Sequence, residues 1–183
     1  MKYLSTLIKS GIAVIATASV VFYSSGTLAA QRVVFAYRGF RQSLSVDELT
    51  TFAETGETSP SIRYYLNQTS EDPEVIRNVL TRQFSVTPVT LDRTLNSRIG
   101  QYLLDQISYS IRTPSGQASR QALRSALVLS ASNGNQISLI EIIQNYPTSE
   151  VVVESDRIVR TYNQLSILAQ DLQRIFGTNT SLR

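Results

Sequence analysis

Three helices of this chain are predicted to begin at the same kind of dipeptide, a capping residue followed by proline. The dipeptides are Ser59-Pro60, Asp72-Pro73 and Thr87-Pro88. The first side chain can accept a hydrogen bond from a free backbone N–H of the first turn, and proline fits the next position because its missing N–H needs no partner there. The closely spaced starts leave room for helices of about two to three turns each. The middle of the chain therefore folds as a set of short amphipathic helices.

Two serines open further helices through a capping box, in which a glutamate three residues later returns a hydrogen bond to the serine backbone. Ser45 and Glu48 form the first box, and Ser138 and Glu141 form the second. The helix after Ser45 is expected to end at Gly56, because glycine readily adopts the left-handed conformation that closes a helix.

Apolar residues at helical spacing predict two longer helices. Ile99, Leu103, Ile107 and Ile111 step by four and indicate one helix that ends near residues 113–116. The second is expected over about residues 117–131, where small residues on one face allow close packing against a neighbour.

Strand signals lie near the two ends of this helical region. Residues 32–46 are rich in β-branched and aromatic residues around a Tyr37-Arg38-Gly39 break, which predicts a hairpin, and Val151-Val152-Val153 predicts a short strand. Since two strands alone are marginally stable, the hairpin must pack on the helices. The predicted fold class is mainly α: a compact multi-helix domain over residues 31–155, with about seven short-to-medium helices, a small N-terminal β-hairpin and one further short strand.

Residues 156–183 are predicted to form a C-terminal amphipathic helix. Its apolar positions are spaced 4, 3, 4, 3 and 4 residues apart, which is the seam of a short heptad pattern. They are Ile158, Tyr162, Leu165, Ala169, Leu172 and Phe176. This face packs either across the core of its own domain or against a second chain or domain.

The first thirty residues have the order of a secretory signal peptide. Lys2 and Lys9 supply the positive start, residues 11–23 the apolar run, and residues 24–30 the small-residue stretch, with cleavage expected after Ala29 or Ala30. We expect export across the inner membrane to the periplasm or beyond. The alternative is an uncleaved membrane anchor over residues 10–30, although the apolar run is shorter than the roughly 20 residues that span a bilayer.

The charge of the chain does not indicate a nucleic-acid partner. The sequence has 17 basic and 14 acidic residues, and its two lysines both lie in the leader. The mature chain is therefore close to neutral, and its arginines are scattered singly rather than clustered as nucleic-acid binding requires. A membrane contact is expected only through an uncleaved leader.

The composition excludes much enzyme chemistry. The chain has no His and no Cys, so it cannot form a Ser-His-Asp triad, a Cys-His dyad, a zinc site or a disulfide. It also has no G-x-S-x-G nucleophile elbow and no phosphate-binding loop. We therefore predict no catalytic, cofactor-binding or metal-ligating residue, and no cofactor.

Two groups of side chains were still weighed as sites. Carboxylates are clustered, but most are expected in the first turns of helices, where the helix dipole stabilises negative charge. Glu150, Glu154 and Asp156 could form an all-oxygen cation site, although the sequence around them lacks the ordered pattern of a calcium-binding loop. Tyrosines could line an apolar pocket or be half-buried in the core. The sequence has nine tyrosines, among them Tyr64, Tyr65, Tyr102 and Tyr109.

Four stretches carry a family resemblance. They are SLSVDELTTFAETG (43–56) with the preceding FAYRGF, FSVTPVTLDRTLNSRIGQYLLDQISYSIRTPSG (84–116), SALVLSASNGNQISLIEIIQNYP (125–147) and VVVESDRIV (151–159). Over about residues 31–176 the chain resembles the N-terminal helical domain of unknown function of cyanobacterial predicted α/β-hydrolases. In such proteins a leader and this domain precede a separate catalytic domain, and the resemblance implies that residue 183 lies near the point where that domain would begin. No catalytic residue of the family can be carried over.

Three hypotheses for function follow. The first is a secreted, non-catalytic helical module that binds a partner, an α/β-hydrolase domain on another chain, through the C-terminal seam or an edge strand. The second is a small-molecule or lipid carrier or sensor with a cleft between the short helices. The third is a weak hydrolase that uses a carboxylate or tyrosine base.

Overall fold

The structure is a computed structural model that describes residues 29–157, and these residues form seven α-helices and six short strands. The helices are α1 (Val46–Thr55), α2 (Pro60–Thr69), α3 (Pro73–Thr81), α4 (Pro88–Asn96), α5 (Arg98–Ser108), α6 (Ser119–Ala131) and α7 (Leu139–Gln144). The strands are β1 (Arg32–Tyr37), β2 (Phe40–Ser45), β3 (Phe84–Ser85), β4 (Ile111–Arg112), β5 (Gln136–Ile137) and β6 (Glu150–Glu154), and a 3-10 helix η1 (Ser155–Arg157) follows. The predicted class, mainly α with an N-terminal hairpin, is confirmed.

The helix starts predicted from capping residues are confirmed. The side chains of Ser59, Asp72 and Thr87 each accept a hydrogen bond from a first-turn N–H, and proline holds the first helical position after each. Both capping boxes are present, at Ser45 and at Ser138. The end of α1 is also as predicted: Gly56 adopts the left-handed conformation, and its N–H donates to the carbonyl of Phe52.

The strands form two sheets. The larger has the order β2-β1-β6-β4, in which β1 pairs antiparallel with β2 and parallel with β6, and β4 pairs antiparallel with β6. The smaller pairs β3 with β5. The sequence predicted β6 as the one strand beyond the hairpin, so β3, β4 and β5 correct that part of the prediction. Each has two residues, too few to show a period-two pattern.

The helix predicted to continue through Ile111 ends earlier. α5 stops at Ser108, and Ile111 lies in β4 opposite Val153, fully buried against the central strand. Pairing with a distant strand outweighs the helical spacing there, which local sequence cannot show.

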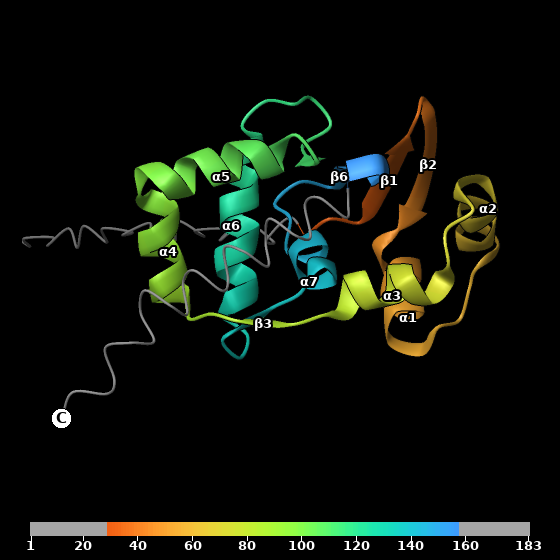
Figure 1. Cartoon of the computed structure of the whole chain (residues 1–183), viewed down its shortest axis with the longest axis horizontal. Helices are drawn as coiled ribbons and strands as arrows, with labels where there is room; N and C mark the ends of the chain where they lie inside the picture. Colours follow the sequence, from red (N-terminus) through yellow and green to blue (C-terminus); the bar gives the residue numbers. More distant parts are fainter. Residues whose placement is uncertain (1–28, 158–183) are drawn as a thin grey trace, which may run out of the picture.

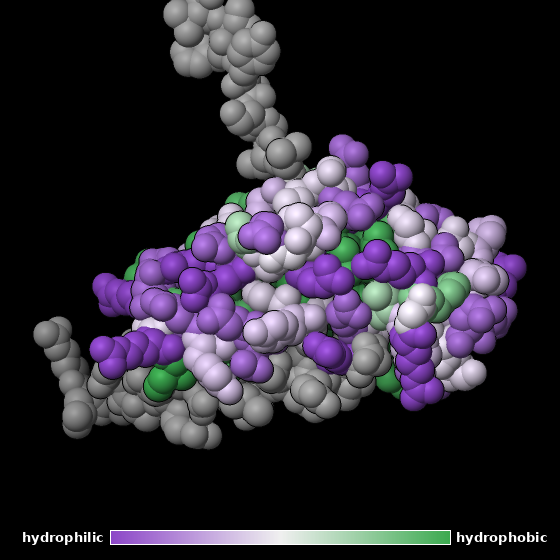
Figure 2. Space-filling model, turned by 90° about the horizontal axis from the view of Figure 1, so that it is seen from above, coloured by the Kyte–Doolittle hydropathy of each residue, from purple (hydrophilic) through white to green (hydrophobic). Residues whose placement is uncertain are grey.

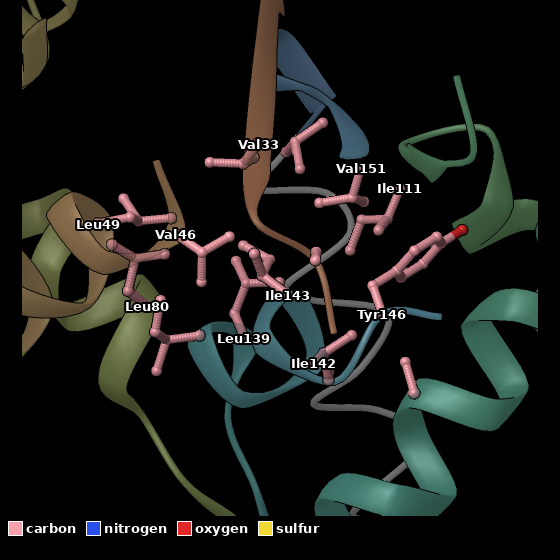
Figure 3. Close-up of a cluster of buried hydrophobic side chains, with 14 of the residues drawn as sticks. Val33, Val46, Leu49, Leu80, Ile111, Leu139, Ile142, Ile143, Tyr146 and Val151 are labelled. Atoms are coloured by element: carbon pink, nitrogen blue, oxygen red, sulfur yellow. The ribbon is translucent and has the colours of Figure 1, made fainter. Parts of the chain in front are cut away.

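Two lobes share one core (Figure 1). The hairpin lobe contains β1, β2, α1, α2 and α3, and the corner lobe contains α4, α5 and α6, which pack pairwise on one another. α7 lies between them and contacts α1, α3 and α6. In Figure 3, Leu139 and Ile143 of α7 point toward Val46 and Leu80, while Tyr146 reaches the other way, past Ile111. The short helix α7 thus closes the core of both lobes.

The predictions for the leader and for the C-terminal seam fall on residues 1–28 and 158–183, which lie outside the described residues. Ala30, one of the two expected cleavage residues, is described: its side chain is 5% exposed and belongs to the core, whereas Ala29 is exposed. The backbone is fixed immediately afterwards, because the N–H of Gln31 donates to Ser149 and its carbonyl accepts from Val46.

Candidate binding surface

Exposed large hydrophobic side chains concentrate on the corner lobe. Among the described residues, five of the seven belong to its helices or the turn after α5, and Tyr64 and Val75 lie on the hairpin lobe. The five are Val89, Ile99, Tyr102, Tyr109 and Leu129. Exposed apolar side chains that gather in one region mark interaction surfaces more often than isolated ones do.

Three of these residues lie along one face of α5 and its end. Ile99, Tyr102 and Tyr109 are 73%, 62% and 63% exposed, and their spacing of three and seven residues places them on one side of a helix. We call this row the α5 stripe. The expectation that Ile99 shares the buried face with Leu103 and Ile107 is wrong.

Gly100 is the physical reason for that orientation. It lies against the end of α4, where a Cβ would overlap the carbonyl oxygen of Thr94 and would sit 2.7 Å from the Cα of Leu95. The backbone of α5 therefore approaches α4 along the Gly100 side, and the neighbouring Ile99 turns toward solvent. Ser97 links the two helices as the C-cap of α4 and the N-cap of α5.

A groove of about 910 Å³ borders the α5 stripe. Tyr102 and Tyr109 line it from α5 and its end, and the loop before α6, together with the first turn of α6, lines it from the other side. Figure 2 views the molecule from above Figure 1 and shows a mainly hydrophilic surface with small separate hydrophobic areas. The groove thus combines aromatic rings with polar groups.

The charges at the groove are paired. The Arg120 guanidinium lies 3.3 Å from the Asp105 carboxylate, which joins α6 to α5, and Arg112 lies 2.9 Å from Glu154. The groove therefore presents aromatic rings beside two guanidinium groups, each of which is paired with a carboxylate.

The loop that lines the groove is held by its own hydroxyl groups. Thr113 Oγ1 donates to the Gln117 carbonyl at 2.8 Å, and Ser119 Oγ donates to the Gly116 carbonyl at 3.1 Å. Ser119 Oγ also accepts from the Thr113 N–H at 3.3 Å. The N-cap of α6 is Ala118, which has a φ of 54° and provides no side-chain cap. The sequence predicted a break at residues 113–116 and a helix from about residue 117, but it gave no signal for the hydroxyl contacts that hold this loop.

The structure separates the four tyrosines that were weighed as one pocket. Tyr102 and Tyr109 line the groove, while Tyr64 and Tyr65 lie on α2 in the other lobe. The Tyr65 ring packs 5.0 Å from Phe35 in the core, and burial raises the pKa of its hydroxyl. Tyr146, buried beside α6, also has a raised pKa because of burial. Neither buried phenol is suited to act as a base near neutral pH.

Four of the clustered carboxylates cap helices or pair with arginines. Hydrogen bonding from the Ser45 backbone N–H lowers the pKa of Glu48, the capping-box partner, and Asp72 caps α3. Glu150 pairs with Arg32 at 3.9 Å, and Glu154 pairs with Arg112. The described part of the chain holds no cluster of three or more residues that could ligate a metal.

None of the helices in residues 29–157 has both the length and the apolar character needed to span a bilayer.

A family model described as "Alpha/beta hydrolase of unknown function (DUF1400)" matches residues 29–154, from just before the buried Ala30 to the last residue of β6. The chain belongs to this family. The DUF1400 match covers both sheets and all seven helices of the described residues, and it confirms the predicted resemblance to a domain of unknown function associated with hydrolases. No curated protein and no solved structure matches the chain.

The matched range differs in two respects from the catalytic domain of an α/β-hydrolase. The matched range contains no His and no G-x-S-x-G motif. Its larger sheet has a single parallel pair, β1 with β6, rather than the mostly parallel sheet of an α/β-hydrolase. Cyanobacterial origin and a position before a catalytic domain stay predictions.

Proposed function

We propose that this DUF1400 protein is an exported, non-catalytic accessory module that binds an α/β-hydrolase domain on another chain through the α5 stripe and the groove beside it. The observation that carries the proposal is the row of Ile99, Tyr102 and Tyr109, held outward beside the groove. Tyrosine and arginine are enriched at protein–protein contacts because they combine apolar area with hydrogen-bonding groups. The family description names an α/β-hydrolase, and we take such a domain on another chain as the proposed partner.

The non-catalytic part of the proposal rests on the chemistry of the chain. Its 183 residues contain no His or Cys, and Glu48 is a helix-capping carboxylate with a lowered pKa. A carboxylic acid that donates a proton in catalysis needs a raised pKa instead.

Export is proposed from the first thirty residues, and the structure of Ala30 favours one of the two cleavage positions. Cleavage after Ala29 leaves the buried Ala30 in place as the new N-terminus, whereas cleavage after Ala30 removes it from the core. Intact-mass measurement of the exported chain is expected to give a first residue of Ala30; a chain found uncleaved in the membrane fraction would contradict the proposal.

The binding proposal is tested by affinity capture of the C-terminally tagged chain from an extract of its own host, with mass spectrometry of what is retained. The test variant is Tyr102→Ala with Tyr109→Ala, and the matched control is Tyr64→Ala, an exposed tyrosine on the hairpin lobe. We expect the wild type and the control each to retain a hydrolase in an amount near-equal to that of the tagged chain. The double variant is expected to retain at least ten-fold less hydrolase.

Circular dichroism must show that the double variant is folded, and its free energy of unfolding is expected to change by less than about 0.5 kcal/mol because both side chains are exposed. Equal retention by the double variant would reject the α5 stripe as the contact. Retention of a lipid or small molecule in place of a protein, seen by native mass spectrometry, would favour the carrier hypothesis.

A further inference from the structure

The strand β6 is buried on both of its faces. Its three consecutive valines, Val151, Val152 and Val153, are 0%, 2% and 0% exposed, although successive side chains of a strand point to opposite faces. β6 also pairs parallel with β1, and parallel strands are typically covered on both faces. Both faces of β6 are therefore covered.

The inner face of the sheet is covered by the core. Val33 and Phe35 of β1, together with Val151 and Val153 of β6, point into the single hydrophobic cluster, and the Phe35 ring contacts Tyr65 of α2. The registers of the strands place these residues side by side.

The outer face carries a second apolar strip. The same register sets Val34 beside Val152, and Ala36 follows on that face. Val152 and Ala36 are 2% and 8% exposed, yet neither belongs to the core cluster of the described residues. Two ion pairs border the strip, Arg32 with Glu150 and Arg112 with Glu154. An apolar centre with charged edges is the pattern of a surface against which an amphipathic helix packs.

We propose that the outer face of β1 and β6 is the docking site of the chain's own C-terminal segment, which packs there through Ile158, Tyr162, Leu165, Ala169, Leu172 and Phe176. The segment begins directly after η1, which contacts β1, so no linker is needed to reach the sheet. As a helix, residues 158–176 would be roughly 28 Å long at 1.5 Å per residue, and four strands spaced about 4.8 Å apart are narrower than that. The seam is long enough to cross every strand.

This inference goes beyond the proposed function and does not depend on it. It places the C-terminal seam against the sheet of its own chain, whereas the α5 stripe stays available to a partner.

The native chain has no cysteine, so introduced pairs report contacts without background. We would combine Val34→Cys in turn with Tyr162→Cys, Leu165→Cys and Ala169→Cys in the full chain, and would oxidise each purified variant mildly. The matched controls combine Ile99→Cys, on the α5 stripe, with the same three substitutions. We expect a disulfide within one chain for at least one Val34→Cys pair and for none of the Ile99→Cys pairs.

A second measurement removes the seam without truncating the chain. The rate at which a thiol reagent labels Val34→Cys is expected to rise at least ten-fold when Leu165→Glu and Leu172→Glu are added, while the labelling rate of Ile99→Cys stays unchanged. An unchanged rate at Val34→Cys, the absence of any Val34→Cys cross-link, or cross-links that join two chains would each overturn the proposal. Because no partner is present in either experiment, failure here is distinct from failure of the capture test.

Discussion

The two lobes of this DUF1400 protein differ in how they treat apolar surface. In the hairpin lobe, helices α1 and α2 turn Phe52, Ala53, Ile62 and Leu66 inward, and its exposed large hydrophobic residues are Tyr64 and Val75. The corner lobe buries Leu91, Leu95, Leu104 and Leu123 equally well but leaves a row of large side chains on the outside of α5. The difference shows that the α5 stripe is a local feature and not a sign of a loosely packed protein.

The contacts that join helices within each lobe differ as well. A side chain joins two elements of the hairpin lobe: the Arg77 guanidinium of α3 donates to the carbonyls of Ala53 and Glu54 at the end of α1, at 3.0 and 2.8 Å. In the corner lobe, the backbones of α4 and α5 meet directly at Gly100. Direct backbone contact leaves no room for adjustment, so we expect the corner lobe to tolerate substitution less well.

The largest effect is expected for Gly100→Ala. The added methyl group would overlap backbone atoms of Thr94 and Leu95, which cannot move aside as a flexible side chain can. We expect a loss of about 3 kcal/mol or more in the free energy of unfolding, measured by urea denaturation. The control is Gly116→Ala, where a Cβ meets open space and the positive φ alone costs about 1 kcal/mol. Equal losses for the two variants would show that the contact of Gly100 with the backbone of α4 does not determine the loss.

Ile143→Ala is expected to cost about 3 kcal/mol, because it leaves a cavity at a fully buried position of α7. Since α7 contacts both lobes, the variant should still unfold in one transition at a lower urea concentration. Hydrogen exchange that shows one lobe opening while the other stays protected would instead make the lobes independent units.

Arg77→Ala is expected to cost about 1 to 2 kcal/mol, because two carbonyls at the end of α1 lose a charged donor. Arg63→Ala is the control, since that exposed side chain donates to a single carbonyl, that of Thr58. Thermal unfolding of both variants compares the losses directly. A loss at Arg77 no greater than at Arg63 would show that packing alone joins α1 to α3.

The smallest effect is expected for Glu48→Gln, about 0.5 kcal/mol at neutral pH because the capping box is partly open to solvent. The folded-state pKa of Glu48 is lowered, so its contribution is full above the unfolded value near 4.5 and is lost as the pH falls through the folded value. The gap between wild type and variant, followed by denaturation from pH 7 to pH 3, should therefore shrink in acid. A difference in stability that widens as the pH falls would contradict the role of ionised Glu48 in the capping box.

Sequence reasoning predicted the features that neighbouring residues determine. Ser45, Ser59, Asp72, Thr87 and Ser138 each act within one turn of their own helix, so their roles are visible in the sequence. The hairpin and β6 were also predicted, because their runs of β-branched residues are long enough to show a pattern.

Features that depend on distant residues were missed. Ile111 becomes a strand residue because Val153 pairs with it, and Ile99 is exposed because Gly100 meets α4. The sequence predicted only part of the candidate surface. It indicated Tyr102 and Tyr109 as pocket residues, but it grouped them with Tyr64 and Tyr65, because their separation depends on the packing of the two lobes.

The parallel pairing of β1 with β6 also has a consequence for the order of folding. β1, the first strand of the described region, aligns Arg32 with Glu150, a residue near the other end of that region. Its register cannot form until nearly the whole domain has left the ribosome. The helices can form earlier from local contacts, whereas closing such a long loop is slow. We therefore expect the late step of folding to be the insertion of β6 between β1 and β4, after the helices have gathered around α7.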